Sequence, residues 1–444
     1  MQTKILLWFD VEDYVTPQAD DAFKEVLDML GTLGIRATVK FVTKKLETLQ
    51  VRGRTDILRL LPNHEMAFHS TLHSVHPMPS EYLNGYEFAA GAAEFDRREY
   101  PGFLKVSELT GQHQTSYGQA SYAWAPQVFP AMRKWGVTTY LDAHQIINMD
   151  EMPFWYGGVL CLTRMKDNII RLQHRDGALP QYIAGYEARD RRGDISFVST
   201  YDHPTEYCTQ LLWDRPFAHG VNPRVLNPAP LRAEGEQSKY IGMLRDFILY
   251  TLRDGAEYIT VSQAAGYEKR RVRPITAEDL REYAAGFDGK VSYAEVAGEW
   301  LSASEVFSLC ARALTGRALT PELLWGPEED TPSVFHTETV PVTELAQAAY
   351  AQHDLVLGYK QLKTLYRVGD NFINPLDMQA TMLRALREGG ETVALTRAME
   401  LAAAAHVDDS FKFTSSVLFE GNFKGEEIFR QTRLQCWTLK PTRF

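Results

Sequence analysis

Two histidines and three carboxylates stand where they could bind one divalent cation. His69 and His73 are four residues apart, so on a helical turn both imidazoles would lie on one face and reach the same ion. A carboxylate has to complete such a ligand set, and Asp10, Glu12 and Asp13 follow the first apolar run of the chain. Because α/β folds bind ligands at the carboxyl ends of their strands, we expect these acidic residues to face the histidines. The alternative is a pair of surface or capping histidines.

The surrounding sequence predicts the elements that would position these groups. Residues 4–9 form an apolar run typical of a buried strand, and residues 20–33 repeat apolar side chains with a helical period. A β-rich run at 37–42 follows two glycines that end the helix. This strand, helix and strand are the first unit of a parallel α/β arrangement. A further short apolar run, 64–68, leads directly into His69.

These stretches resemble the opening of the polysaccharide deacetylase, or NodB-homology, family of carbohydrate esterases. The resemblance is carried by Phe9–Glu12, Leu27–Leu30, Leu33–Thr38, His64–Glu65 and His69–His73. It implies an α/β fold, a distorted (β/α) barrel, over about residues 4–265. Matched position by position, it implies Asp10 as the catalytic base and Glu12, His69 and His73 as metal ligands. Asp13 is the alternative to Glu12, because a turn could aim either carboxylate inward.

The third motif of that family departs from the usual pattern. It resembles Tyr122–Pro126, but Trp124 stands where relatives usually carry an arginine. That arginine normally holds the catalytic carboxylate, whereas Trp124 offers one indole donor and no charge. We therefore expect either that another residue orients Asp10 or that catalysis is altered or absent. Arg133 and Arg164 are two residues that could replace the arginine.

A candidate general acid follows a later strand. The alternating run at 195–202 stops at His203, which precedes a proline. A histidine displayed at the end of a strand is well placed to protonate a leaving group. The stretch resembles the family's late His-Pro-x-Glu motif, which implies that role for His203.

Aromatic residues beside glycines form a candidate sugar-binding surface. Trp155 and Tyr156 precede Gly157 and Gly158, a composition suited to stacking on a sugar ring. Core aromatics at a turn of the barrel wall would give the same pattern. With Trp124, these two residues are the substrate-binding candidates.

Composition excludes several classes of protein. The chain has 444 residues, 45% of them hydrophobic and 23% charged, which is globular, and its net charge of −10 argues against nucleic acid or an anionic membrane as partner. No apolar run approaches the roughly eighteen residues of a transmembrane helix, and the first run is too short for a signal peptide, so we expect a cytoplasmic chain. The four cysteines are scattered, as expected for buried free thiols.

We expect two domains. Residues 1–270 would form the barrel, and residues 271–444, after a basic run with a proline, a mainly helical accessory domain. Within it, residues 301–314 align with residues 373–386, which suggests two related helical units. This region shows no ligand spacing, so we assign it to binding, substrate shaping or oligomerisation.

The sequence therefore predicts a metal-dependent hydrolase that removes N-acetyl groups from an amino-sugar glycan. Zinc suits two histidines and a carboxylate best, and cobalt, manganese and nickel suit similar ligands. One alternative is a hydrolase of the same fold acting on a small non-sugar amide or a cyclic imide. Another is a non-catalytic glycan-binding relative that keeps the metal site. A homo-oligomer is compatible with the sequence.

Overall fold

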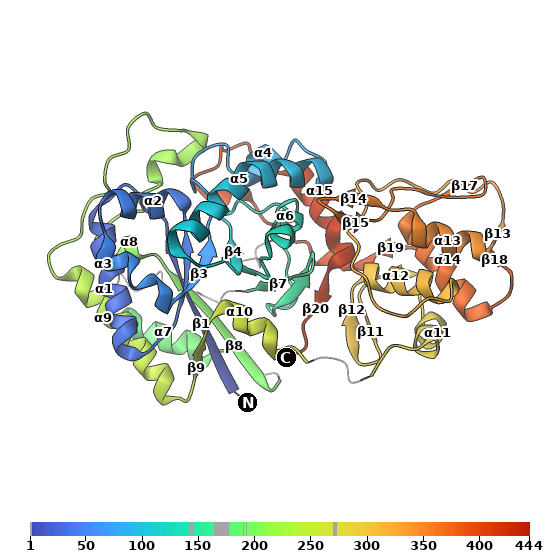
Figure 1. Ribbon diagram of the computed structural model, residues 1–444, viewed down its shortest axis with the longest axis horizontal. Coiled ribbons are helices and arrows are strands. Elements are labelled where there is room, and N and C mark those ends of the chain that lie inside the picture. Colours follow the sequence, from blue (N-terminus) through green and yellow to red (C-terminus); the bar gives the residue numbers. More distant parts are fainter. Residues whose placement is uncertain (1, 142–145, 164–176, 190, 192, 270–272) are drawn as a thin grey trace.

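The computed structural model has a large α/β part and a smaller part of helices and short hairpins, with the C-terminal stretch of the chain running between them (Figure 1). The structure describes residues 2–141, 146–163, 177–189, 191, 193–269 and 273–444. Among the helices of these residues, none is both long enough and apolar enough to cross a bilayer.

A curled sheet, ten-stranded over the described residues, forms the α/β part. Its order is β20-β6-β7-β5-β4-β3-β2-β1-β8, and β9 also pairs with β1. The strands from β7 to β8 along this order run parallel, whereas β6 is antiparallel to both of its neighbours. The bounds are β1 (Gln2–Val11), β2 (Thr38–Phe41), β3 (Glu65–Phe68), β4 (Ser116–Gly118), β5 (Thr139–Leu141), β6 (Phe154–Tyr156), β7 (Val159–Leu162), β8 (Ile195–Asp202), β9 (Glu257–Ile259) and β20 (Lys440–Pro441). The predicted fold class, a distorted (β/α) barrel, is confirmed.

Helices between the strands cover the outside of this sheet (Figure 1). The predicted first helix is present as α1, whose apolar side chains at a helical period are buried and which ends at Gly34, a residue with φ of 67°. The helices are α1 (Gln18–Leu33), α2 (Thr43–Val51), α3 (Thr55–Leu58), α4 (Pro79–Leu83), α5 (Phe88–Thr110), α6 (Val128–Trp135), α7 (Ala178–Glu187), α8 (Pro204–Cys208), α9 (Glu236–Arg253) and α10 (Val261–Ala264). The 3₁₀ segments of this part are η1 (Leu61–Asn63), η3 (Arg215–Gly220), which is kinked at Ala218 and His219, and η4 (Ala265–Tyr267).

The smaller part combines helices with two-stranded sheets around a core of its own. Its helices are α11 (Ala277–Ala285), α12 (Ala303–Leu314), α13 (Val342–Ala351) and α14 (Pro375–Glu388). Its strands are β10 (Lys290–Val291), β11 (Ala294–Val296), β12 (Glu299–Leu301), β13 (Thr339–Pro341), β14 (Asp354–Val356), β15 (Tyr359–Gln361), β16 (Tyr366–Val368), β17 (Asn371–Ile373), β18 (Thr392–Ala394) and β19 (Glu400–Leu401).

The two aligned stretches occupy equivalent places in this part. Each begins at the end of a hairpin and continues into a helix: β11–β12 leads to Ser302, which caps α12, and β16–β17 leads to Asn374, which caps α14. In each case the capping side chain accepts a hydrogen bond from the backbone N–H three residues later. Duplication of these two stretches remains a prediction. The repeated unit would be a hairpin followed by a helix.

The last part of the chain returns to the barrel. We call residues 402–444 the return segment. It contains η5 (Ala402–His406), η6 (Phe413–Ser415), α15 (Glu426–Leu434) and η7 (Gln435–Thr438), and it ends with β20, which extends the barrel sheet beside β6. The division at residue 270 stays a prediction; the return segment extends the barrel sheet through β20, and through Trp437 and Lys440 it also contacts the smaller part.

Candidate metal centre and active site

Glu12, His69 and His73 converge at the carboxyl end of the sheet. Glu12 follows β1 and His69 follows β3, so the parallel strands bring both to one edge. Glu12 Oε2 lies 2.9 Å from His73 Nε2 and 3.2 Å from His69 Nε2, and all three side chains are buried. The predicted helical turn is wrong: Ser70 and His73 have φ of 69° and 59°, so a left-handed turn presents the second imidazole.

The hydrogen bonds of the two imidazoles show that these residues fit a cation. His69 Nδ1 is 2.8 Å from the Gly118 carbonyl oxygen, which can only accept, so Nδ1 carries the proton. His73 Nδ1 is 2.6 Å from Ser74 Oγ, whose own proton goes to Asp214 Oδ2, so this Nδ1 also donates. When both rings are neutral, each points an Nε2 lone pair at the same carboxylate oxygen. Burial lowers the pKa of His73, but the Glu12 carboxylate outweighs it and raises this pKa above its usual value, so a cation would compete with a proton for Nε2. Three electron-pair donors facing one another are the donor set of a divalent metal site.

A second pair of groups lies beside this set. Asp10 Oδ2 is 3.6 Å from His203 Nε2, and His203 Nδ1 is 2.8 Å from Glu206 Oε2. Burial lowers the pKa of His203, but the Glu12 and Glu206 carboxylates outweigh it and raise the pKa to about 9. His203 is therefore protonated at neutral pH. Asp10 and His203 therefore lie side by side as a carboxylate that can accept a proton and an imidazolium that can donate one.

Lys40 supplies the positive charge that holds Asp10. Its Nζ lies 2.8 Å from Asp10 Oδ1, and the two residues are register partners in the parallel pair β1–β2. Burial raises the pKa of Asp10, yet Lys40 and His69 outweigh it and keep the pKa below its usual value. A side chain at Gly118 would block this contact, since a Cβ there would lie 2.5 Å from Lys40 Nζ.

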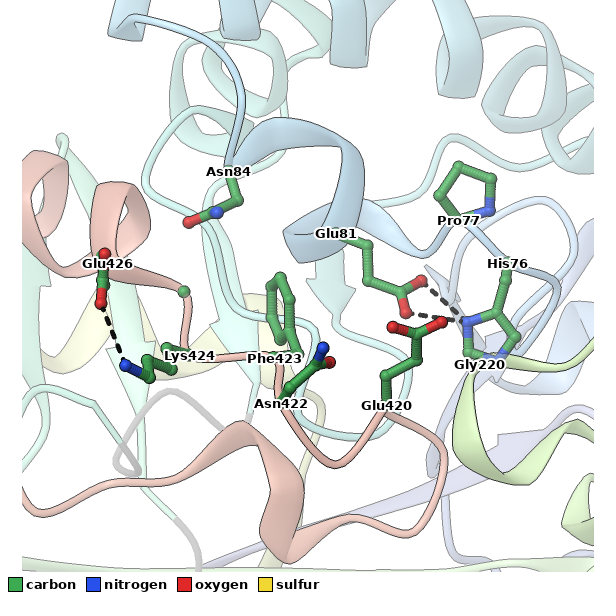
Figure 2. A pocket seen from close by; sticks show the side chains of 11 residues that line it. His76, Pro77, Glu81, Asn84, Gly220, Glu420, Asn422, Phe423, Lys424 and Glu426 are labelled. Carbon is green, nitrogen blue, oxygen red and sulfur yellow. Dashed lines mark hydrogen bonds and ion pairs between the residues drawn. The ribbon is translucent and has the colours of Figure 1, made fainter.

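A cavity of about 260 Å³ is lined by Asp10, Glu12, His69, His73 and His203. The remaining lining residues are Gln119, Ser121, Tyr122, Tyr201, Leu212, Asp214 and Ser415–Leu418. A larger cavity of about 590 Å³ lies where the return segment passes α4 (Figure 2). There His76 Nδ1 is 2.8 Å from Glu81 Oε2, and its Nε2 is 2.9 Å from the Phe217 carbonyl oxygen, so this histidine is engaged at both nitrogens.

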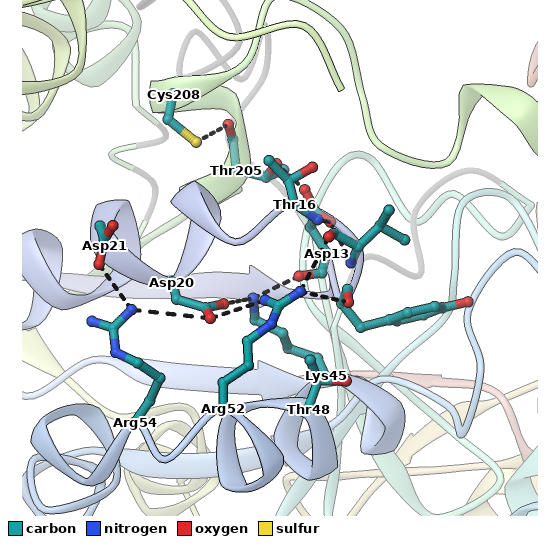
Figure 3. Close-up of polar contacts among 12 residues, drawn as sticks. Asp13, Thr16, Asp20, Asp21, Lys45, Thr48, Arg52, Arg54, Thr205 and Cys208 are labelled. Atoms are coloured by element: carbon teal, nitrogen blue, oxygen red, sulfur yellow. Dashed lines mark hydrogen bonds and ion pairs between the residues drawn. The ribbon is translucent and has the colours of Figure 1, made fainter. Parts of the chain in front are cut away.

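Asp13, the alternative ligand, faces a different set of partners. Its Oδ1 accepts from the backbone N–H groups of Val15 and Thr16 at 2.9 and 2.8 Å, and its Oδ2 accepts from Thr205 at 2.6 Å. Figure 3 shows it next to the ion-paired residues Asp20, Lys45 and Arg52. Because both oxygens of Asp13 are engaged in holding the chain, the geometry favours Glu12 as the ligand.

Trp124 lies in the core of the barrel. Its indole nitrogen donates to Thr432 Oγ1 at 3.1 Å, and its ring contacts Phe129 and Tyr140. Arg133 stacks on Tyr359 instead of reaching Asp10, so its predicted role as the replacement is wrong, and Arg164 lies outside the described residues. The sequence patterns did not predict Lys40 as a site residue, although a lysine inside a short buried strand was an available signal.

Trp155 and Tyr156 lie on β6, and neither is among the described residues that line the cavity. Tyr156 is buried and donates its hydroxyl proton to the Thr432 carbonyl oxygen at 3.0 Å. Trp155 donates to Glu268 at 2.7 Å. In the structure all three aromatic candidates have intramolecular partners away from the cavity.

No protein-family model matches the chain, and no curated protein matches it. Solved structures with a similar fold include a 4-alpha-glucanotransferase from Thermococcus litoralis, at 12% identity over 60% of this chain and 41% of that one, with a TM-score of 0.43. The match thus spans less than half of the glucanotransferase. Others are a protein assigned as a polysaccharide deacetylase from Mycobacterium smegmatis, at 16% identity over 60% and 90% with a TM-score of 0.40, and a CE4 family pseudoenzyme from Bacillus anthracis, at 11% over 59% and 65% with a TM-score of 0.35.

Proposed function

We propose that the protein is a metal-dependent hydrolase that removes the N-acetyl group of an amino sugar. The observation that carries the proposal is the convergence of Glu12, His69 and His73 on one point, with Asp10 and His203 beside them. The two carboxylates and three histidines come from three segments of the sequence, and they meet in one buried cavity. Zinc is the ion that this donor set suits best, with cobalt, manganese or nickel as substitutes.

The residues divide the chemistry between them. A divalent ion held by Glu12, His69 and His73 would polarise the amide carbonyl and lower the pKa of a water molecule. Asp10 accepts the proton of the attacking water, and Lys40 keeps Asp10 ionised and fixes its orientation. His203, kept protonated by Glu206, gives its proton to the amine nitrogen as the carbon–nitrogen bond breaks. Acetate and a free amine are the products.

Lys40 also answers the question raised by Trp124. The cation that orients the base comes from the neighbouring strand instead of the third motif, so an arginine at position 124 is not required for an oriented Asp10. This contact favours the catalytic proposal over a glycan-binding relative without activity.

The test measures metal and acetate together. The zinc-loaded protein is incubated with N-acetylglucosamine and its oligomers, and with succinimide as a small cyclic imide. Acetate release is expected, and Asp10→Asn should lower it by at least about a hundredfold, the scale of a lost general base, with zinc still bound. His69→Ala and His73→Ala should lose zinc without unfolding, because the site lies at the rim above the core.

Other outcomes would contradict the proposal. Full zinc occupancy in either histidine variant would show that the pair is structural. Turnover of the imide alone would favour the non-sugar hydrolase, for which the small cavity also has room. Zinc binding without turnover of any substrate would leave a binding protein.

A further inference from the structure

The return segment forms one wall of the active-site cavity. Four consecutive residues of it, Ser415–Leu418, line the same cavity as Asp10, Glu12 and the histidines. They lie more than two hundred residues beyond the last catalytic candidate, His203, after the whole of the smaller part of the molecule. The barrel alone would lack this wall.

This stretch is attached to loops on two sides of the cavity. Ser416 Oγ is 2.7 Å from Ser121 Oγ, in the loop after β4. The carbonyl oxygens of Val417 and Leu418 each accept a hydrogen bond, at 2.8 Å, from the backbone N–H groups of His219 and Gly220 in η3. The segment therefore connects the loop after β4 with η3 across the mouth of the barrel.

The segment is also fixed before and after the crossing. Upstream, Val407 forms a β-bridge with Ile147. Around the crossing, five phenylalanines of the segment contact one another through their rings: Phe411, Phe413, Phe419, Phe423 and Phe429. Downstream, β20 pairs with β6. These attachments hold the segment in place as a wall of the cavity.

The consequence concerns the size and entry of the substrate. At about 260 Å³ the cavity lies just below the roughly 300–1,000 Å³ typical of small-ligand sites. An internal unit of a polysaccharide needs a groove that the chain can enter on one side and leave on the other. Among the residues that the structure describes, a crossing between two sides of the mouth would close such a groove.

We propose that the substrate is a single N-acylated amino sugar, or the terminal unit of a short chain that enters end-on, and that Ser415–Leu418 exclude internal units. This rests on the proposed deacetylase function. Val417 is the residue best placed to set the limit, because it lines the cavity and is 59% exposed, so truncating it disturbs little packing.

The first experiment compares chain lengths on the full-length, zinc-loaded protein. N-acetylglucosamine and its oligomers of two to six units are the probes, and mass spectrometry locates the free amine in each product. We expect deacetylation at a chain end only. Binding of the same series to Asp10→Asn gives a readout without turnover, and affinity should stop rising after one or two units.

The second experiment changes the wall. Val417→Ala should raise kcat/KM for the hexamer relative to the monomer by about tenfold, the scale of a small volume change in a specificity pocket, at equal zinc content. Val51→Ala, an 87% exposed valine at the end of α2, is the matched control and should change neither value.

The outcomes separate the two proposals. Deacetylation of internal units, or affinity that grows steadily to six units, would overturn the end-on inference and leave the deacetylase function standing. Absence of acetate from every probe, with zinc bound, would overturn the function and the inference with it.

Discussion

Two polar clusters, one containing Glu12 and the other its neighbour Asp13, differ in how their groups are paired. The mouth cluster comprises Asp10, Glu12, His69, His73 and His203. The support cluster comprises Asp13, Asp20, Lys45 and Arg52. In the support cluster carboxylate oxygens meet donors: the Lys45 ammonium, the Arg52 guanidinium and backbone N–H groups. In the mouth cluster the Glu12 carboxylate faces the Nε2 atoms of two imidazoles whose Nδ1 atoms donate elsewhere, so the rings, when neutral, offer it lone pairs.

The difference distinguishes buried polar groups that stabilise the fold from buried polar groups that bind a ligand. A buried polar group that is completely paired stabilises the fold, whereas buried groups with converging lone pairs need a ligand to complete them. Glu12 and Asp13 both carry a carboxylate and are about equally buried, with 3% and 2% exposure. Their partners, not their burial, assign them to different tasks.

The substitution with the largest expected effect on stability removes the central carboxylate of the support cluster. Asp20→Asn removes the carboxylate that pairs with Lys45 and Arg52 and leaves a buried ammonium without its counter-ion. We expect the free energy of unfolding to fall by about 3–5 kcal/mol in denaturant titrations. Zinc stoichiometry, measured on the folded protein, should not change.

The matched control for that change is Asp21→Asn. Asp21 pairs with Arg54 at 2.8 Å, but its side chain is 67% exposed, so the loss should stay within about 0.5 kcal/mol. Loss of zinc in the Asp20 variant would show that the two clusters are not independent. The division into a stabilising cluster and a metal-binding cluster would then be wrong.

A buried histidine outside both clusters provides a pH test of the same comparison. His64 Nδ1 accepts from the Ala37 N–H at 3.3 Å, and burial lowers the pKa of His64 to about 4. The unfolded chain therefore binds a proton that the folded chain rejects between about pH 6.5 and pH 4. Stability from this residue is complete above pH 6.5 and is lost as the pH falls to 4, by about 3 kcal/mol.

His64→Asn is the variant that measures this contribution, because its amide oxygen can accept the same hydrogen bond and does not titrate. Unfolding free energies of both proteins, taken without metal at several pH values, give the difference. If the difference does not change between pH 7 and pH 4, His64 is not held neutral by burial.

Much of the site was predictable because its residues lie at strand ends close to recognisable sequence patterns. The strand before Asp10, the first helix and the run before His69 follow from apolar periodicity. Lys40 was not predictable in this way, since its contact with Asp10 depends on the register of two parallel strands. The expectation for position 124 failed for the same reason. A motif identifies a position in the sequence, but the positive charge beside Asp10 comes from Lys40 on another strand.

Two further features depend on geometry that no local pattern encodes. The choice of Glu12 over Asp13 depends on the turn after β1, where the N–H groups of Val15 and Thr16 bind Asp13. The wall at Ser415–Leu418 depends on the return segment crossing the barrel mouth. For Asp13 these local bonds combine with a distant one from Thr205, whereas the wall is held by distant bonds alone.

The smallest expected effect sharpens the description of the mouth cluster. Ser74 accepts the His73 Nδ1 proton and donates to Asp214, so it fixes the tautomer that aims the Nε2 lone pair at Glu12. Ser74→Ala removes this link without removing a ligand, and zinc affinity should fall by about 10- to 100-fold, the usual effect of losing a partner that orients a ligand. Competition with a chromophoric chelator measures the affinity. Ser80→Ala, another fully buried serine, is the control and should bind zinc as tightly as the unchanged protein. If Ser74→Ala also binds zinc with unchanged affinity, Ser74 does not set the tautomer of His73. Only His69 would then have a hydrogen bond that directs its Nε2 lone pair toward the Glu12 carboxylate.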